Sequence, residues 1–336
     1  MRVTIHDVAR SAEVSINTVS RVLNARPDVK ETTRAHVWAV IGQLGYRPNH
    51  LARALVRRES RTLGLVITDC TNPNSARQVR VIQQTVREQG YALMIFDTQE
   101  NVDVEQSALQ VLDEYAVEGV ILTPAATAAA ALTPFVQRLP MVLLNREVPG
   151  LDGCDTVMND NATGTADAVR HLIAMGHTRI AYITARWAIS TVRDRLHGFR
   201  TTLAAADIPV HEEMIVVADV SIAAAAAATR LLLPHKPTAI LAYNDLMAVG
   251  VLSAVLDAGL RVPEDIALVG YDDIAYAPYL RVPLTTVAQP TDALATAAAH
   301  LLLQRIAGAT DPPRRVVLAP QLQVRASSYS LRGAVA

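Results

Sequence analysis

Apolar positions near the start of the chain recur with helical spacing. Thr4, with Asp7 three residues later, has the pattern of a capping box, and Ser15 is placed to cap a second helix. A third helix is predicted from about Glu31 to Leu44, ending at Gly45. The predicted core positions of these helices are Ile5, Val8, Ala9, Ala12, Val19, Val22, Leu23, Val37, Val40, Ile41 and Leu44. Two short helices and a tight turn, packed on a third helix, describe a helix-turn-helix module over residues 1–46.

The second predicted helix has a polar face opposite its core face. A helix that enters the major groove of DNA must offer suitable groups to base edges. Asn17 suits an adenine and Ile16 a thymine methyl group, whereas neighbouring polar residues are placed for phosphates or the groove edge. The DNA-binding residues predicted in this module are Thr4, Ser15, Ile16, Asn17, Thr18, Ser20, Arg21 and Asn24. Each one alone is also compatible with an ordinary surface position, so the prediction rests on the module.

Charge is distributed unevenly along the chain. Up to Leu63 there are eleven Lys and Arg residues against five Asp and Glu, a net charge of +6, whereas the whole chain has −1. The remainder therefore has −7. A basic head on an acidic body indicates a polyanion-binding module attached to another domain. On charge alone a solvated charged face is an equal alternative, and the helix pattern decides for DNA.

Residues 47–60 form a second basic segment. Asn49 can cap a short helix in which Leu51 and Leu55 lie one turn apart among arginines. A leucine flanked by basic residues suits a minor-groove wedge, where an apolar side chain opens a base step. The alternative is a linker helix whose leucines pack on the next domain. Asn49 and Leu55 are predicted DNA contacts of this segment.

Beyond Leu63 short apolar runs alternate with helical periods. The runs are LGLVIT, YALMIF, GVILTP, PMVLLN, RIAYIT, AILAY and IALVGY. Strands without polar alternation are buried on both faces and belong to parallel sheets covered by helices. Helices are predicted between them over Ala76–Gln89, Ala162–Met175 and Asp245–Ala258. About 270 residues exceed one doubly wound sheet, so the predicted fold is an all-α head followed by a two-lobed α/β core.

The motifs TIHDVARSAEVSINTVSRVLN, ETTRAHVWAVIGQLGYRPN, LARAL, AYNDLMAVG and GLRVPEDIALVGYDD resemble those of the LacI/GalR (lactose-repressor) family of bacterial transcription regulators. The resemblance extends through the whole chain. It implies a core of the periplasmic-binding-protein type, with chain crossings near Asp160, Gln289 and Pro320. The implied domains are a DNA-binding domain (1–46), a hinge helix (47–60), an N-terminal lobe (61–159 plus 290–319) and a C-terminal lobe (160–289 plus 320–330).

The resemblance also implies roles for residues of the head. Ile16, Asn17 and Arg21 would provide sequence readout, and Leu55 would be the hinge leucine that intercalates in the minor groove. Glu13 departs from the pattern, because the family commonly has Gly or Asn in this turn. Those residues accept positive φ more readily, so a small loss of stability is expected at Glu13.

A small-molecule effector is implied in the cleft between the lobes, where ligands of open α/β sheets bind at the carboxyl ends of strands. Arg195, Asn244 and Asp272 match family effector ligands, and these groups can hold vicinal hydroxyls. Asp245 could also serve, but a helix cap is its expected role. Asn145, Thr191 and Trp187 complete the predicted site; Trp187 offers a stacking face or, alternatively, packs on the surface. Ser75, Ala76 and Val220 replace aromatics of some relatives, which favours a sugar or sugar derivative over a nucleoside or purine.

Other classes of function find less support in the sequence. GxGxxG, GxxxxGK[ST], HExxH and GxSxG motifs are missing, so an enzyme is not expected and no cofactor or metal is predicted. A solute-binding protein would explain the body but not the head, and the start of the chain lacks the apolar run of a signal peptide. Two distant cysteines and no long apolar segment favour a cytoplasmic protein that needs no membrane. The expected protein is a homodimeric repressor that binds a palindromic operator in double-stranded DNA.

Overall fold

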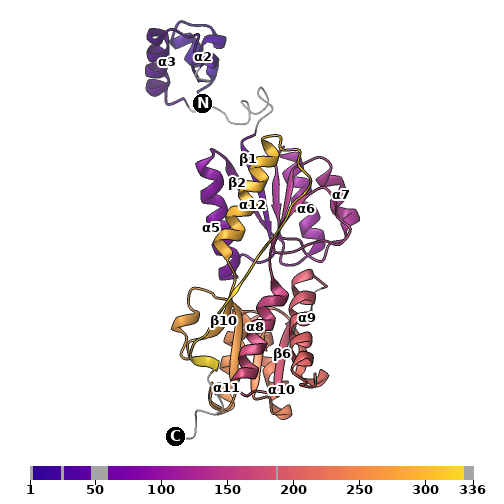
Figure 1. Ribbon diagram of the computed structural model, residues 1–336. Helices are drawn as coiled ribbons and strands as arrows, with labels where there is room; N and C mark the ends of the chain where they lie inside the picture. Colours follow the sequence, from indigo (N-terminus) through magenta and orange to yellow (C-terminus); the bar gives the residue numbers. More distant parts are fainter. Residues whose placement is uncertain (1–2, 24–25, 47–59, 187, 329–336) are drawn as a thin grey trace. The chain divides into compact units, whose positions relative to one another are not determined.

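The computed structural model describes residues 3–23, 26–46, 60–186 and 188–328. The chain divides into two compact units, residues 1–61 and residues 62–336 (Figure 1). In the part of the chain that the structure describes, no helix is long and apolar enough to cross a membrane.

The described residues of the first unit form three helices: α1 (Ile5–Ser11), α2 (Ile16–Leu23) and α3 (Glu31–Leu44). The capping box of α1 is confirmed, because Thr4 N–H donates to Asp7 Oδ2 at 2.9 Å and Asp7 N–H to Thr4 Oγ1 at 3.4 Å. Ser15 Oγ accepts from the N–H of Thr18 at 3.0 Å. The buried core of the unit is Val8, Ala9, Ala12, Val19, Val22, Val37, Val40 and Ile41. Local spacing therefore predicted this unit well.

The turn between α1 and α2 passes through Glu13 at φ = +52°. A non-glycine residue in this left-handed region costs about 1–2 kcal/mol. The sequence predicted that this turn adopts positive φ at Glu13, and the structure confirms it.

Over residues 62–186 and 188–328, the second unit forms two six-stranded sheets with the same strand order. The first sheet has the order β11-β5-β4-β3-β1-β2 and is entirely parallel. The second has the order β12-β10-β9-β8-β6-β7, with only its edge strand β12 antiparallel. The strands of the first are β1 (Thr62–Ile67), β2 (Ala92–Asp97), β3 (Val120–Leu122), β4 (Met141–Leu144), β5 (Asp155–Asn159) and β11 (Arg315–Leu318). Those of the second are β6 (Ile180–Ala185), β7 (Ile215–Ala218), β8 (Ala239–Ala242), β9 (Ala267–Asp272), β10 (Thr285–Ala288) and β12 (Gln321–Gln323).

Each sheet is covered by helices on both faces, as buried parallel strands require. In the N-terminal lobe α5 and α12 cover one face and α6 and α7 the other; in the C-terminal lobe α10 and α11 lie opposite α8 and α9 (Figure 1). The N-terminal helices are α5 (Pro73–Glu88), α6 (Val102–Glu114), α7 (Ala129–Val136) and α12 (Thr291–Ile306). The C-terminal helices are α8 (Asn161–Ala174), α9 (Ser190–Ala205), α10 (Ile222–Leu232) and α11 (Asp245–Asp257). Short 3-10 turns are η1 (Glu212–Met214), η2 (Leu233–His235), η3 (Ala277–Tyr279) and η4 (Ala326–Ser328).

The chain passes between the lobes three times: from β5 to α8, from β10 to α12, and from β11 to β12. Glycines allow the helices of the C-terminal lobe to pack closely. A Cβ at Gly198 of α9 would lie 2.3 Å from the carbonyl oxygen of Ala162, and one at Gly250 of α11 would lie 2.1 Å from that of Ile222. The first of these contacts brings α9 against the start of α8, which directly follows the first crossing.

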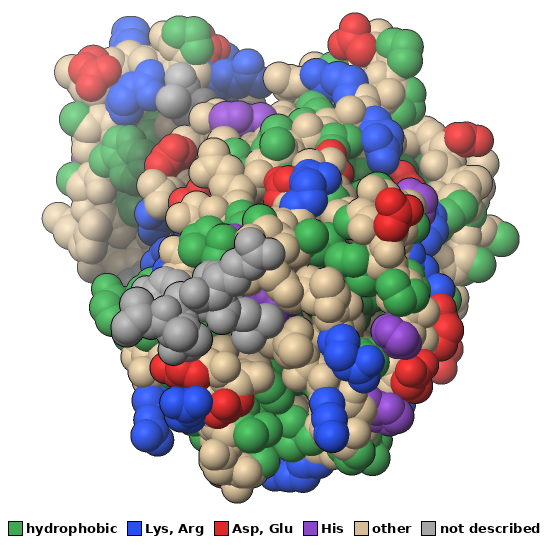
Figure 2. Space-filling view, turned by 60° about the horizontal axis from the view of Figure 1, so that its bottom comes forward, with side chains coloured by type: hydrophobic (Ala, Val, Ile, Leu, Met, Phe, Trp, Pro, Cys, Tyr) green, Lys and Arg blue, Asp and Glu red, His purple; other side chains and the backbone are tan. Residues whose placement is uncertain are grey.

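The surface of the core mixes both charges. Figure 2 shows Lys and Arg side chains interspersed with Asp, Glu and apolar side chains over the face turned to the viewer. Among the described residues of this face, no single sign of charge dominates (Figure 2).

Candidate functional site

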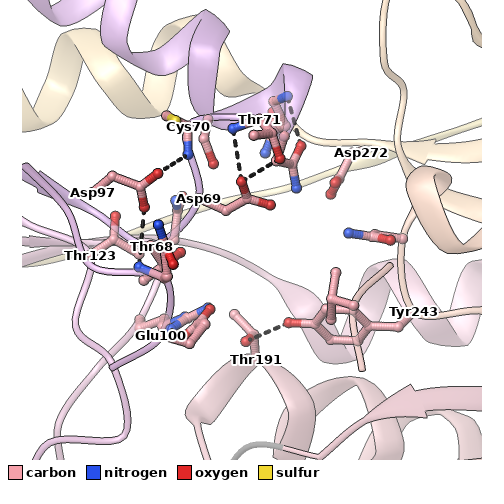
Figure 3. Close-up of a pocket in the computed structure, with 18 of the residues that line it drawn as sticks. Thr68, Asp69, Cys70, Thr71, Asp97, Glu100, Thr123, Thr191, Tyr243 and Asp272 are labelled. Carbon is pink, nitrogen blue, oxygen red and sulfur yellow. Dashed lines mark hydrogen bonds and ion pairs between the residues drawn. The ribbon is translucent and has the colours of Figure 1, made fainter. Parts of the chain in front are cut away.

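A cavity of about 440 Å³ lies between the two lobes, at the carboxyl ends of their strands (Figure 3). Its walls are the loops that follow β1, β2, β3 and β4 on one side, and those that follow β7, β8, β9 and β10, with the start of α9, on the other. Strand ends that face one another across a cleft are the usual ligand site of such sheets. The volume suits a small molecule.

Arg195 of α9 is the buried centre of the C-terminal wall. Its guanidinium carbon lies 3.5 Å from the ring centroid of Tyr271 and 4.7 Å from that of Tyr243. Its Nε donates to Asn161 Oδ1 at 2.9 Å, and its Nη1 donates to the carbonyl oxygen of Tyr243. Stacking and hydrogen bonds together fix the plane of the guanidinium.

Asp272 ends β9 and points into the same cavity (Figure 3). Gln289 Nε2 donates to its Oδ1 at 2.7 Å, and Arg195 Nη2 lies 3.9 Å from that oxygen. Burial raises the pKa of Asp272 to about 6, against the opposing effects of Arg195 and of hydrogen bonds from Gln289 and Asn72. The carboxyl group is therefore an acceptor whose charge changes close to neutral pH.

Asn244, and not Asp245, caps α11. Asn244 has the extended backbone of an N-cap, and its Oδ1 accepts from Met247 N–H at 3.0 Å. Asp245 is the first helical residue; its carboxylate accepts from Ile274 N–H at 2.9 Å and from Thr286 Oγ1 at 2.6 Å. The expectation that Asp245 caps the helix was wrong, because its side chain turns into the core and joins the ends of β9 and β10. Asn244 lines the cavity as predicted.

The N-terminal wall contains a buried ion pair that the sequence analysis missed. Arg146 donates to Glu100 through Nη1 at 2.7 Å and Nη2 at 2.5 Å, and its Nη1 also donates to the carbonyl oxygen of Pro124 at 2.7 Å. Both side chains are less than 10% exposed. Arg146 is the second residue after strand β4, a position that could have indicated the cleft, whereas nothing near Glu100 in the sequence signals its role.

Two further predicted residues, Asn145 and Thr191, lie in the cavity wall. Asn145 exchanges a pair of amide hydrogen bonds with Gln78, at 2.8 and 2.9 Å. Thr191 Oγ1 lies 3.1 Å from Tyr243 Oη (Figure 3). Ser75 and Val220 also line the cavity. Trp187 lies outside the described residues.

The rim beside β1 and β2 is acidic. Asp97 Oδ2 accepts from Cys70 N–H at 3.0 Å, and Asp69 Oδ1 accepts from the N–H and the hydroxyl of Thr71 at 2.8 and 2.6 Å (Figure 3). Asp97 raises the pKa of the Cys70 thiol, mainly through a hydrogen bond. With Glu100 and Asp272, four carboxyl groups and two guanidinium groups line the cavity.

In the first unit, the predicted DNA-binding face of α2 is open to solvent. Ile16 is 41% exposed, and Asn17 and Arg21 are also exposed, whereas Thr18 and Ser20 are half-buried. Arg21 forms an ion pair with Asp28. The exposed Thr4 and Ser15 cap their helices. Asn24, Asn49 and Leu55 lie outside the described residues.

A helix-turn-helix unit joined to a two-lobed core with a polar, ligand-sized cleft defines a class of protein: DNA-binding regulators that respond to small molecules. Comparison with known sequences gives the family. Residues 4–49 match the bacterial regulatory proteins of the lacI family, and residues 169–328 match the periplasmic binding protein-like domain. The chain belongs to the LacI family of transcriptional regulators.

Similarity to individual relatives extends over nearly the full length. The chain is 37% identical to the ribose operon repressor of Escherichia coli over 97% of its length and 99% of the relative's. It is 32% identical to the HTH-type transcriptional repressor PurR of Aliivibrio salmonicida, covering 98% of this chain and 99% of that one. The crystal structure of the lac repressor dimer bound to operator and the anti-inducer ONPF superposes with a TM-score of 0.89 at 27% identity, covering 98% of this chain and all of that one.

Proposed function

We propose that this chain represses transcription as a homodimer on a two-fold DNA operator, and that an uncharged sugar bound between its lobes controls this binding. The observation that supports the sugar most directly is that both arginines of the cleft are hydrogen-bonded to other groups of the protein. Arg146 is engaged by Glu100 and Pro124, and Arg195 by Asn161 and the Tyr243 carbonyl. Neither guanidinium offers the free two-pronged edge that binds phosphate well.

Surplus carboxyl groups also disfavour an anionic ligand. Asp69, Asp97 and Asp272 line the cavity, and among the described residues no arginine lies within hydrogen-bond distance of them; Arg195 Nη2 comes to 3.9 Å from Asp272 Oδ1. A phosphate placed among them would be repelled in a site of low dielectric constant. Sugar hydroxyls, in contrast, can donate to carboxylates and accept from amide and hydroxyl groups. The cleft therefore favours a polyol without charge.

A purine effector is the second candidate, because a PurR repressor is among the relatives. A purine gains most from an aromatic stacking face. Among the described residues of the wall, Tyr243 is the aromatic side chain, and Arg195 already lies over its ring. This arrangement favours the sugar, and we assign its recognition to Asn145, Trp187, Thr191, Arg195, Asn244 and Asp272.

For DNA, we assign base contacts to Ile16 and Asn17, phosphate or groove-edge contacts to Ser20 and Arg21, and the minor-groove wedge to Leu55. A single head of about +6 binds weakly in salt, whereas two heads on one operator combine their contacts. Effector binding would alter the lobes and thereby the heads, with a coupling free energy of about 1–3 kcal/mol. Such a regulator acts where the chromosome is, in the cytoplasm.

Thermal unfolding with matched ligands tests the effector class. D-ribose and other free pentoses and hexoses are compared with D-ribose 5-phosphate, adenosine and hypoxanthine. A ligand at about 100 times its Kd adds about 2.7 kcal/mol to the free energy of unfolding. We expect a shift from one of the free sugars, lost in Asp272→Asn. A shift from a phosphorylated sugar or a purine base alone would contradict the proposal.

Selection of binding sites from random DNA tests the head. Asn17→Ala should relax the base preference at one position of each half-site, at a cost of about 1–3 kcal/mol. Gln43→Ala, an exposed amide of α3, is the matched control and should change nothing. Leu55→Ala should weaken binding to the selected operator while the sugar-induced thermal shift persists. A selected site without two-fold symmetry would contradict the homodimer.

A further inference from the structure

The loop that follows β4 makes polar contacts with the other lobe at the start of α9. Glu147 N–H donates to Ser190 Oγ at 3.1 Å. Arg193 Nη2 donates to Glu147 Oε1 at 2.7 Å, and Arg315 approaches Oε2 at 3.3 Å. Ser190 and Arg193 belong to the C-terminal lobe, whereas Glu147 and Arg315 belong to the N-terminal lobe. One carboxylate thus bonds an arginine from each lobe.

The same two segments form opposite walls of the effector cleft. Asn145 and Arg146 immediately precede Glu147, and Thr191 and Arg195 flank Arg193. The separation of Glu147 from Arg193 therefore determines the separation of these cleft residues. A contact outside the cavity can in this way adjust the cavity.

A second cavity lies between the two segments. It has a volume of about 380 Å³, and its lining combines the apolar side chains of Val148, Ile189 and Val192 with Glu147, Ser190 and Arg193. A polar space of this size can hold several water molecules, so the segments are not tightly packed where it lies. The contacts of Glu147 with Ser190 and Arg193 therefore join the two segments directly across this space.

The contact remains ionic over the physiological pH range. Hydrogen bonds from Arg193, with smaller effects of Arg315, lower the pKa of Glu147. Asp194 also accepts from Arg193 Nε at 2.8 Å, so the arginine is held from two sides. The pair is partly exposed, with 53% of the Arg193 side chain and 29% of the Glu147 side chain accessible. Salt, and not pH, should weaken it.

We propose that Glu147 and Arg193, with Ser190, form a latch that holds the lobes at the separation required for effector binding. The latch rests on the proposed function, because it acts on the affinity of that cleft. Without it, a smaller fraction of the protein has the binding-competent separation, and the apparent Kd rises by the inverse of that fraction. The latch residues touch no effector and act by position alone.

Hydrogen–deuterium exchange of the ligand-free protein tests the latch without reference to any effector. Glu147→Gln removes the charge that joins the lobes, and Arg315→Gln is the matched control, because it removes a partner from within the N-terminal lobe. We expect faster exchange in residues 145–149 and 188–193 of Glu147→Gln, and unchanged exchange there in the control. Unchanged exchange in Glu147→Gln, or equal acceleration in both variants, would overturn the latch.

Calorimetric titration with D-ribose, or with whichever free sugar stabilises the protein, gives the second measurement. An exposed ion pair of this kind predicts a Kd about two- to fivefold higher in Glu147→Gln. Arg193→Gln should raise the Kd by a similar factor, and the double variant Glu147→Gln/Arg193→Gln should lose no more affinity than either single variant. Faster exchange with an unchanged Kd would overturn the link to affinity. If no sugar binds the wild-type chain, the proposed effector class fails while the exchange experiment still decides the latch.

Discussion

The two lobes share one strand order but equip their strand ends with different chemistry. The N-terminal wall has its buried charges paired: Arg146 with Glu100, while Asn145 and Gln78 satisfy each other as amides. The C-terminal wall holds Arg195 between tyrosine rings and leaves Asp272 with a raised pKa. The buried charges of the N-terminal wall are thus paired with each other, and we call this wall closed, although its half-buried rim carboxylates Asp69 and Asp97 accept hydrogen bonds from N–H groups rather than from an arginine. The C-terminal wall keeps a buried carboxyl group available to a ligand, and we call it open.

The largest expected effect is a loss of unfolding free energy when the ion pair of the closed wall is broken. Arg146→Gln leaves the Glu100 carboxylate buried without its partner, which costs about 3–5 kcal/mol of unfolding free energy. The double variant Glu100→Gln/Arg146→Gln buries no charge and should lose much less. Urea denaturation of the three proteins measures the difference. Equal losses in the single and double variants would show that the charges of this wall are not closed on each other.

The open wall should respond to pH. The folded pKa of Asp272, about 6, lies above its ordinary value of 3.8, so folding favours the protonated form. The ionised carboxylate of Asp272 therefore lowers the free energy of unfolding above pH 6. This loss disappears as the pH falls from about 6 towards 4, which raises the free energy of unfolding by up to about 3 kcal/mol. Stability should rise over this window, while affinity for a sugar should fall because the carboxylate acceptor is lost.

Asp272→Asn isolates this contribution. Burial and the nearby charge of Asp272 both raise the pKa of Asp245, whereas Arg195 keeps its charge at both pH values. The difference in unfolding free energy between wild type and Asp272→Asn at pH 7.5 and pH 5 therefore reports Asp272 together with its interaction with Asp245. The same difference at both pH values would contradict the open wall.

The smallest expected effect compares one cap from each lobe. Asn101 caps α6 in the N-terminal lobe, and Asn244 caps α11 in the C-terminal lobe. Replacing either with alanine should cost about 1 kcal/mol of unfolding free energy. Only Asn244→Ala should also weaken sugar binding, because Asn244 lines the cavity. Calorimetric titration of both variants measures this, and weaker binding in Asn101→Ala would remove the distinction.

Residues of the C-terminal wall could be predicted because each lies in a short local motif. Arg195, Asn244 and Asp272 stand in RLHG, YND and GYDD, which match the family's motifs, and Asn244 and Asp272 also lie where a predicted helix begins and a predicted strand ends. The closed wall could not be predicted in the same way. Glu100 lies 46 positions from Arg146, and Gln78 lies 67 positions from Asn145. No periodicity relates residues at such separations before the sheet is formed.

The strands likewise fall into a group that the local sequence pattern predicted and a group that it missed. The strands predicted as continuous apolar runs are β1, β2, β3, β4, β6, β8 and β9. The edge strands β7, β11 and β12 were missed, and so were the inner strands β5 and β10, whose sequences DTVMN and TTVA begin with polar residues. β11 alternates exposed and half-buried residues, and β12 contains two glutamines in three residues. Neither pattern has the uniform burial that marked the inner strands. The cap of α11 could not be predicted either. Asn244 and Asp245 are adjacent and both can cap a helix, so the capping residue depends on where the helical backbone begins.

Three passages between the lobes also determine the order in which the protein can be built. Helix α12 supplies Leu294, Ala298 and Leu302 to the core of the N-terminal lobe, but it is synthesised roughly 130 residues after β5. At about 5–20 residues per second, this is a delay of roughly 7–25 s on the ribosome. Throughout that time one face of the first sheet is covered by α5 alone, and the surface that α12 will cover is exposed. Nascent chains of this protein are therefore expected to depend on chaperones until the second crossing has emerged.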